Sequence, residues 1–132
     1  MGSGRTTHNA SLQAALKEAQ SGIPECVAVG HVALANGELL ALSGTGELRD
    51  VVASAAAELF EGTGAADSLF GAPVGGSEFQ EILIFSRELL HAFIRSKKHP
   101  DQAVVFVCQG TVNIGMALSK TRLAVATLEA SF

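Results

Sequence analysis

Apolar residues follow two spacings along the chain, one typical of helices and one typical of strands. Stripes with gaps of three and four residues indicate amphipathic helices, and short apolar runs between turn residues indicate strands. In chain order the pattern predicts a helix over 11–19, strands over 25–34 and 38–43, a helix over 48–60, strands over 79–87, 89–95 and 103–108, and a helix over 114–128. The chain therefore mixes helices and strands within one unit.

Local signals fix some of these boundaries. Asn36-Gly37 separates the first two strands and is a strong hairpin signal. Alternation in the first strand slips by one residue near Gly30, which predicts a β-bulge there. Asn113 precedes the last helix and is predicted to be its N-cap. The run 103–108 is apolar throughout, so it is predicted to be a central strand.

Two segments lack either spacing. Residues 62–77 contain five glycines, one proline and little charge, which predicts a long loop. Residues 1–10 carry no apolar stripe and are predicted to form a flexible leader before one domain over 11–132. The leader also lacks the apolar stretch of a secretory signal, so a cytoplasmic location is expected.

Composition restricts the classes of partner. The 132 residues carry nine Lys and Arg against thirteen Asp and Glu, a net charge of −4 that disfavours nucleic acid. The longest apolar run, 103–108, is far shorter than the roughly 20 residues of a membrane-spanning helix, so no membrane insertion is expected. Hydrophobic residues make up 48% of the chain. This high fraction predicts that some apolar surface faces another chain.

No motif predicts catalysis. Ser43-Gly44-Thr45-Gly46 lies between a strand and a helix, but Arg49 stands where a dinucleotide-binding fingerprint needs glycine. The histidines show no metal-ligand spacing, and no serine lies in a nucleophile motif. Cys26 and Cys108 lie in apolar runs, where buried free thiols are favoured over a disulfide. We therefore expect no enzymatic activity, no cofactor and no metal.

The sequence resembles the roadblock / dynein light-chain family, including its bacterial Mgl-type members. The resemblance covers residues 11–131 and is carried by 23–29 leading into 35–41, an apolar strand followed by Asn-Gly and a second apolar strand, and by 111–117, a closing N-x-G segment. It implies an α+β fold similar to roadblock and profilin domains, with one five-stranded antiparallel sheet flanked by three helices. The first and third helices would cover one face of the sheet and the second helix the other.

The resemblance also implies dimerisation through the second helix and an edge strand. The residues agree, because the predicted helix 48–60 is small or apolar over most of its surface and the strand 79–87 has only Glu81 to discourage edge pairing. The predicted homodimer interface comprises Val52, Ala53, Ala56, Leu59, Phe60, Ile82 and Ile84.

A further set of residues is predicted to bind a partner. It combines charged residues of the second helix, two apolar residues of the long loop and the basic turn after the fourth strand: Arg49, Glu58, Glu61, Leu69, Phe70, Arg95, Lys97 and Lys98. For Leu69 and Phe70 the alternative is that they pin the loop onto the domain. For the basic turn the alternative is simple solvation.

Three functional hypotheses follow. The leading one is a non-catalytic, homodimeric adaptor or regulator that binds a Ras-like small GTPase or another roadblock protein, as a scaffold or as an activator of GTP hydrolysis. The first alternative is a small-molecule sensor or enzyme that uses a cleft near Gly44–Gly46 and the loop 62–77. The second alternative is a structural subunit of a larger motor or signalling complex.

Overall fold

The computed structural model of the chain describes residues 3–33, 38–44, 80–86 and 88–132. Its elements are helix α1 (Ser3–Gly22), strands β1 (Cys26–Ala33), β2 (Glu38–Gly44), β3 (Glu81–Ser86), β4 (Leu89–Arg95) and β5 (Gln102–Gln109), helix α3 (Ile114–Leu128) and the 3-10 helix η2 (Glu129–Ser131). The Asn36-Gly37 turn, the predicted helix 48–60 and the predicted loop 62–77 lie outside the described residues.

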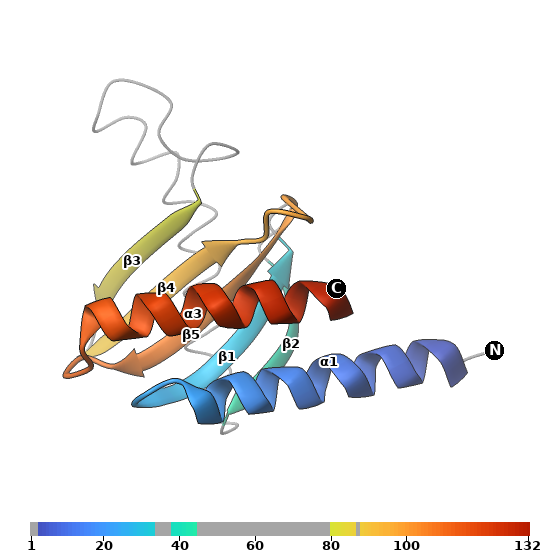
Figure 1. The fold of residues 1–132 in the computed structure, drawn as a ribbon, viewed down its shortest axis with the longest axis horizontal. Coiled ribbons are helices and arrows are strands. Elements are labelled where there is room, and N and C mark those ends of the chain that lie inside the picture. Colours follow the sequence, from blue (N-terminus) through green and yellow to red (C-terminus); the bar gives the residue numbers. More distant parts are fainter. Residues whose placement is uncertain (1–2, 34–37, 45–79, 87) are drawn as a thin grey trace.

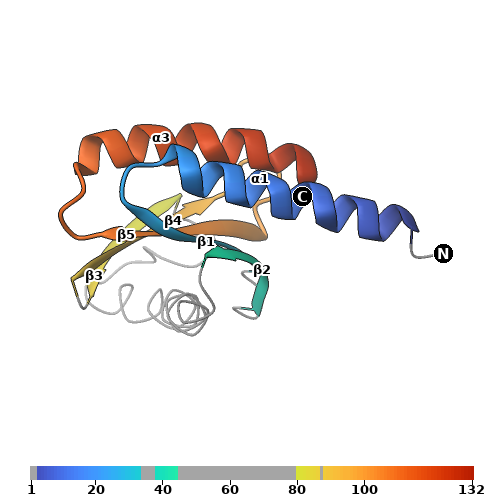
Figure 2. The ribbon, with the colours of Figure 1, turned by 90° about the horizontal axis from the view of Figure 1, so that it is seen from below.

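The five strands form one sheet in the order β2-β1-β5-β4-β3 (Figure 1). Each neighbouring pair is antiparallel. Helices α1 and α3 lie on the same face of this sheet (Figure 2). The predicted α+β fold with a single five-stranded antiparallel sheet and a central β5 is therefore confirmed, and two of its three predicted helices are described.

Strand β5 separates two apolar clusters, because its side chains alternate between the faces of the sheet. Val104, Phe106 and Cys108 belong to the cluster beneath α1 and α3. Val105 and Val107 belong to a second cluster on the opposite face, around Phe93. The central strand thus requires burial on both faces.

Helix α1 begins at Ser3, so the start predicted at Ser11 is wrong, and residues 3–10 of the predicted leader are helical. The apolar stripe begins at Leu12, which is buried together with Leu16. The stripe therefore marks where the helix reaches the sheet. Helical backbone continues beyond that point because no proline interrupts residues 3–22. The N-terminal part of α1 extends past the sheet (Figures 1 and 2).

The β-bulge predicted at Gly30 is also misplaced. Pairing of β1 with β2 passes from Ala41 to Leu39 between His31 and Val32, so the extra residue is Leu40 of β2. Pairing of β1 with β5 shifts between Cys26 and Ala28, so a second extra residue is Val27. A slip in sequence alternation does not reveal which strand carries the added residue.

Helix α3 begins as predicted. The Asn113 side chain accepts a hydrogen bond from the backbone N–H of Met116 at 2.9 Å, which satisfies one of the free donors of the first turn. The helix buries Ala117, Thr121, Val125 and Leu128 against the sheet. Ile114, a predicted apolar position, is 39% exposed.

Glu129 connects η2 to the turn after β4. Its carboxylate accepts hydrogen bonds from the Ser96 hydroxyl at 2.5 Å and from the backbone N–H of Lys98 at 2.9 Å. The Ser96 hydroxyl oxygen in turn accepts from the N–H of His99. Burial raises the pKa of Glu129, but these hydrogen bonds outweigh burial and leave the pKa below its ordinary value. One carboxylate therefore fixes the conformation of this turn.

Replacing this carboxylate should destabilise the fold. Since hydrogen bonds to charged groups contribute about 1.5–3 kcal/mol, Glu129→Gln should lower the free energy of unfolding at pH 7 by roughly that amount in a urea titration. The folded pKa is lowered, so the stabilisation is complete above the ordinary pKa of 4.5 and is lost as pH falls through the folded pKa. The difference in the free energy of unfolding between wild type and Glu129→Gln should therefore become smaller as the pH falls below 4.5. Glu18→Gln, at an exposed position of α1, is the control; a constant difference down to pH 3 would contradict this assignment.

Gly110 follows β5 at a close approach between two turns. Its N–H donates to the Glu88 carbonyl oxygen at 2.8 Å. A Cβ at this position would lie 2.7 Å from the same oxygen, which belongs to backbone and cannot rotate away. The contact therefore requires glycine.

Gly110→Ala should consequently lower the free energy of unfolding by about 1–3 kcal/mol, the usual cost of overpacking. Gly22→Ala is the matched control, because an added Cβ at Gly22 meets nothing within 4 Å. Urea denaturation should show the first variant destabilised and the second at or above wild-type stability. If both substitutions changed the free energy of unfolding equally, the close contact between Gly110 and the Glu88 carbonyl would not be what requires glycine.

Candidate protein-interaction surface

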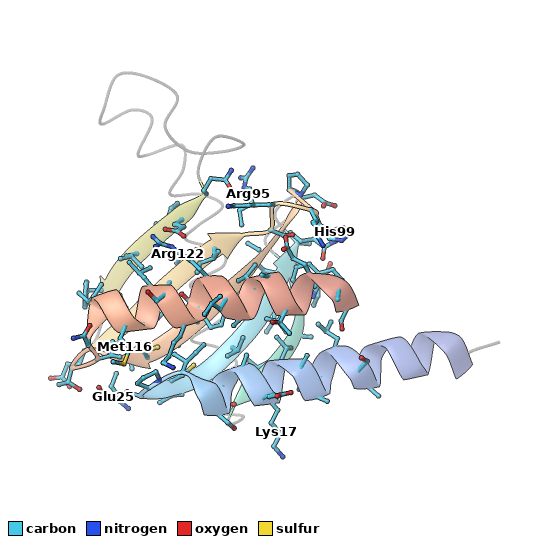
Figure 3. The ribbon with its side chains drawn as sticks, viewed as in Figure 1. Lys17, Glu25, Arg95, His99, Met116 and Arg122 are labelled. Atoms are coloured by element: carbon cyan, nitrogen blue, oxygen red, sulfur yellow. The ribbon has the colours of Figure 1, made fainter. Side chains whose placement is uncertain are left out.

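Exposed apolar side chains gather on one side of the described chain. Of the six large apolar residues that are exposed in the described chain, Leu40 lies on β2 and the other five lie on β3 and α3: Leu83, Phe85, Ile114, Met116 and Leu123. Met116 lies at the N-terminal end of α3 (Figure 3). We call Leu83, Phe85, Ile114 and Met116 the β3–α3 patch.

Register places the two β3 members of the patch on the helix-covered face. Leu83 lies opposite Ala92 and Phe85 opposite Leu90, and both partners belong to the cluster beneath α1 and α3. Leu83 is 38% exposed and Phe85 is 57% exposed, because β3 lies at the rim of the sheet. The helix-side face of β3 is therefore partly open to solvent.

The other face of β3 carries the predicted interface residues Ile82 and Ile84. Both are half-buried and pack against the Phe93 cluster. The remaining predicted interface residues, Val52, Ala53, Ala56, Leu59 and Phe60, lie outside the described residues. The structure therefore brings the described pair together on one strand and leaves the interface itself a prediction.

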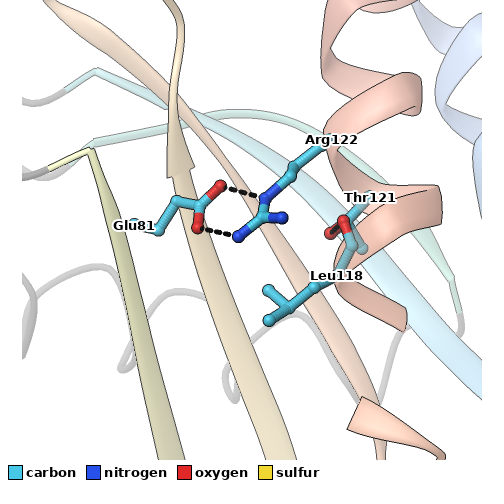
Figure 4. Close-up of polar contacts among 4 residues, drawn as sticks. All are labelled: Glu81, Leu118, Thr121 and Arg122. Carbon is cyan, nitrogen blue, oxygen red and sulfur yellow. Dashed lines mark hydrogen bonds and ion pairs between the residues drawn. The ribbon is translucent and has the colours of Figure 1, made fainter. Parts of the chain in front are cut away.

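Strand β3 is an edge strand that begins with a charged residue. The two oxygens of Glu81 accept hydrogen bonds from Arg122 of α3, at 2.6 Å from Nε and 2.7 Å from Nη2 (Figure 4). The hydrogen bond with Arg122 lowers the pKa of Glu81 and raises that of Arg122. This ion pair ties the start of the edge strand to α3, and beyond it the described side chains of β3 are apolar.

The basic turn divides into a buried and an exposed part. Lys97 and Lys98 are exposed, as the prediction requires. Arg95, the last residue of β4, is only 7% exposed, and its role as a contact residue stays a prediction. Arg95 lines a small cavity of about 220 Å³ together with Glu81 and Arg122. Figure 3 labels Arg95 and Arg122. Arg49, Glu58, Glu61, Leu69 and Phe70 lie outside the described residues.

The cleft expected near Gly44–Gly46 corresponds in part to an open groove of about 620 Å³ between α1 and β2. Its polar groups already bind one another. Ser43 Oγ donates to Gln20 at 2.7 Å, Gln20 donates to the Val27 carbonyl at 3.2 Å, and Gln13 donates to the Leu42 carbonyl at 2.6 Å. These groups hold α1 to the sheet and do not converge on a ligand, which disfavours a binding site here.

The structure contains an aromatic stack, formed by His31, His99 and Phe132, that the sequence did not predict. The rings of His31 and Phe132 are parallel with centroids 4.2 Å apart, and His99 lies against Phe132 at 5.8 Å. His31 also exchanges a hydrogen bond with Gln102 at 2.5 Å. Residues one hundred positions apart share no local pattern, so no signal in the sequence could have paired them.

Groups that could carry chemistry are sparse in the described part of the chain. No three residues among His, Cys, Asp and Glu gather there as a metal site would require. His91 is buried with Nδ1 at 3.3 Å from the Ile84 carbonyl, as expected of a core histidine. None of the described helices is long and apolar enough to cross a membrane.

Comparison with known proteins supports the fold. No family model matches the sequence, and no curated protein matches it. Among solved structures, a Roadblock/LC7 domain from Streptomyces avermitilis aligns with a TM-score of 0.69 at 9% identity, over 89% of this chain and 94% of that one. Myxococcus xanthus MglB aligns with a TM-score of 0.66 at 15% identity, over 89% and 91% of the two chains. Acanthamoeba castellanii profilin IA aligns with a TM-score of 0.52 at 16% identity, over 91% and 98%. The chain therefore has the Roadblock/LC7 fold.

Proposed function

We propose that this protein is a non-catalytic adaptor or regulator that acts as a cytoplasmic homodimer and binds a Ras-like small GTPase or another roadblock protein. The observation that carries the proposal is the edge strand β3, whose described side chains beyond Glu81 are apolar and include the exposed Leu83 and Phe85. An unpaired, apolar edge is an aggregation hazard in a monomer and an interface in an assembly. Similarity of fold to MglB and MglC supports the regulator class.

The proposed dimer joins β3 to its copy in a second chain. Ile82 and Ile84 stay half-buried against the Phe93 cluster, so pairing at the edge extends an apolar layer that already exists. Residues Val52, Ala53, Ala56, Leu59 and Phe60 of the predicted helix would complete this interface. Leu83 and Phe85 would become buried at the rim on the opposite face.

The partner surface would use exposed charge. Lys97 and Lys98 extend from a turn whose backbone Glu129 holds, so their ammonium groups are presented on a fixed support. Charged residues at the rim of an interface raise the association rate more than the affinity. The proposed contacts also include five residues outside the described chain, chosen from the sequence for their charge or their apolar side chain: Arg49, Glu58, Glu61, Leu69 and Phe70.

If the β3 edge forms the dimer, wild type should show a dimer mass by light scattering at tens of micromolar. Phe85→Glu should shift this mass toward the monomer, because it places a charge in each copy of an apolar interface. The substituted side chain is 57% exposed, so the fold should tolerate the change.

The matched control is Leu123→Glu, which places the same charge on an apolar residue of α3 that is 70% exposed and is not part of the β3–α3 patch. It should leave the dimer intact. A monomeric wild type, or an equal loss of dimer in both variants, would show that the β3 edge is not the interface.

Exchange of charge on the basic turn tests partner binding. The double variant Lys97→Glu, Lys98→Glu should slow association with a GTP-loaded Ras-like GTPase several-fold, and the difference should shrink as salt increases. Stopped-flow measurements against a panel of such GTPases supply the rates. Multiple-turnover GTP hydrolysis with and without the protein then separates an activator from a scaffold.

Lys120→Glu is the control for charge, since Lys120 is exposed on α3 away from the turn. Its association rate should stay close to that of wild type. Failure of every GTPase and roadblock candidate to bind wild type would contradict the proposed partner class, and equal slowing by Lys120→Glu would contradict the proposed place of contact.

A further inference from the structure

Cys26 and Cys108 are directly opposed across the central strand pair. Cys26 opens β1, Cys108 lies near the end of β5, and the two are register partners in the antiparallel ladder. Both are free thiols. The sequence separates them by more than eighty residues, so only the fold brings the two sulfurs together.

The local hydrogen bonding identifies the kind of pair they form. The N–H of Gln109 donates to the Glu25 carbonyl oxygen at 3.0 Å, so the hydrogen-bonded position is the one next to the cysteines. Cys26 and Cys108 therefore occupy a non-hydrogen-bonded pair, in which the Cα atoms lie about 4.5 Å apart and the side chains are closest. This separation falls within the roughly 4.4–6.8 Å that a disulfide spans.

The two thiols already interact. The Cys26 thiol donates a hydrogen bond to the Ala28 carbonyl oxygen at 3.4 Å. The neighbouring Cys108 thiol and burial raise the pKa of Cys26, and the neighbouring Cys26 thiol lowers the pKa of Cys108. Cys108 is buried, and Cys26 is half-buried. The fold therefore encloses Cys108 more completely than Cys26, so Cys26 is assigned the first exchange with a disulfide in solution.

We propose that Cys26 and Cys108 form a redox-active dithiol that closes to an intramolecular disulfide in exchange with a small disulfide such as oxidised glutathione. The Cys26 thiol first releases its proton to solvent, and the resulting thiolate attacks one glutathione sulfur, which breaks the glutathione disulfide and releases the first glutathione thiolate. The Cys108 thiolate then attacks Cys26 and releases the second. The protein loses two protons and two electrons, and glutathione disulfide becomes two molecules of glutathione.

Closure would join β1 to β5 at the end of the sheet where α1 ends and α3 begins. Glu25, beside Cys26, already binds the Thr111 hydroxyl at 2.7 Å, so a covalent bond here would reinforce an existing contact. In a compartment kept reduced by glutathione the two cysteines stay thiols, and the disulfide forms only when the glutathione redox potential of that compartment becomes more oxidising. The proposal concerns the folded domain alone and does not depend on the proposed partner or dimer.

Equilibration of the full chain in glutathione redox buffers tests this site. After acid quenching, intact-mass spectrometry should show a monomer about 2 Da lighter than the reduced protein, with both cysteines resistant to alkylation. The equilibrium constant for closure should be at least about tenfold higher in buffer than in 8 M urea, because the fold supplies the register. Cys26→Ser and Cys108→Ser should each abolish the lighter species.

Moving one thiol by a single residue is the matched control. Val107 points to the opposite face of β5, so the double variant Val107→Cys, Cys108→Val keeps the cysteine count and the apolar character but removes the opposition. This variant should not close, and its circular dichroism shows whether the fold is retained. Three outcomes for folded wild type would overturn the proposal: two alkylatable thiols throughout the redox series, a stable glutathione adduct in place of closure, or closure no more favourable than in urea.

Discussion

Six consecutive residues of β5, from Ala103 to Cys108, expose no more than 1% of their surface. A strand in this position must have a hydrogen-bonded neighbour on each side and an apolar layer on each face. Strands β1 and β4 provide the neighbours, and α1 and α3 provide one layer. The opposite layer, around Phe93, Val105 and Val107, is where the family resemblance would place the helix predicted over 48–60. Burial of β5 therefore dictates the layered order of the domain.

The sequence predicted those features whose cause is local. Strand β4 was expected over 89–95 and occupies Leu89–Arg95, and β5 was expected over 103–108 and occupies Gln102–Gln109. A continuous apolar run marked β5, and an apolar run interrupted by His91 marked β4. The Asn113 cap was predictable because a side chain three residues from its donor is itself a local pattern. Of the predicted interaction residues, Lys97 and Lys98 are exposed as expected, since charged residues in a turn are solvated by default.

Features that depend on distant parts of the chain were missed or misplaced. The ion pair of Glu81 with Arg122, the Glu129 contacts with the 96–99 turn and the stack of His31 on Phe132 each join residues more than thirty positions apart. The bulges at Val27 and Leu40 depend on how strands pair, which alternation within one strand does not determine. Arg95 was placed with the surface lysines because composition cannot distinguish the buried end of a strand from the turn that follows it.

The position of Glu81 at the start of β3 has a consequence for the orientation in which this edge can stack. A parallel, in-register stack, the arrangement of amyloid fibrils, would place each Glu81 directly above its copies. Carboxylates in direct opposition destabilise a sheet because their charges repel. The Arg122 of each chain already binds the Glu81 of the same chain at 2.6 Å, so no further cation is supplied to separate the stacked carboxylates. An antiparallel approach centred on Leu83 instead sets each Glu81 opposite Phe85 of the other strand. A single carboxylate thus makes fibrillar stacking unfavourable while leaving a two-fold pairing open.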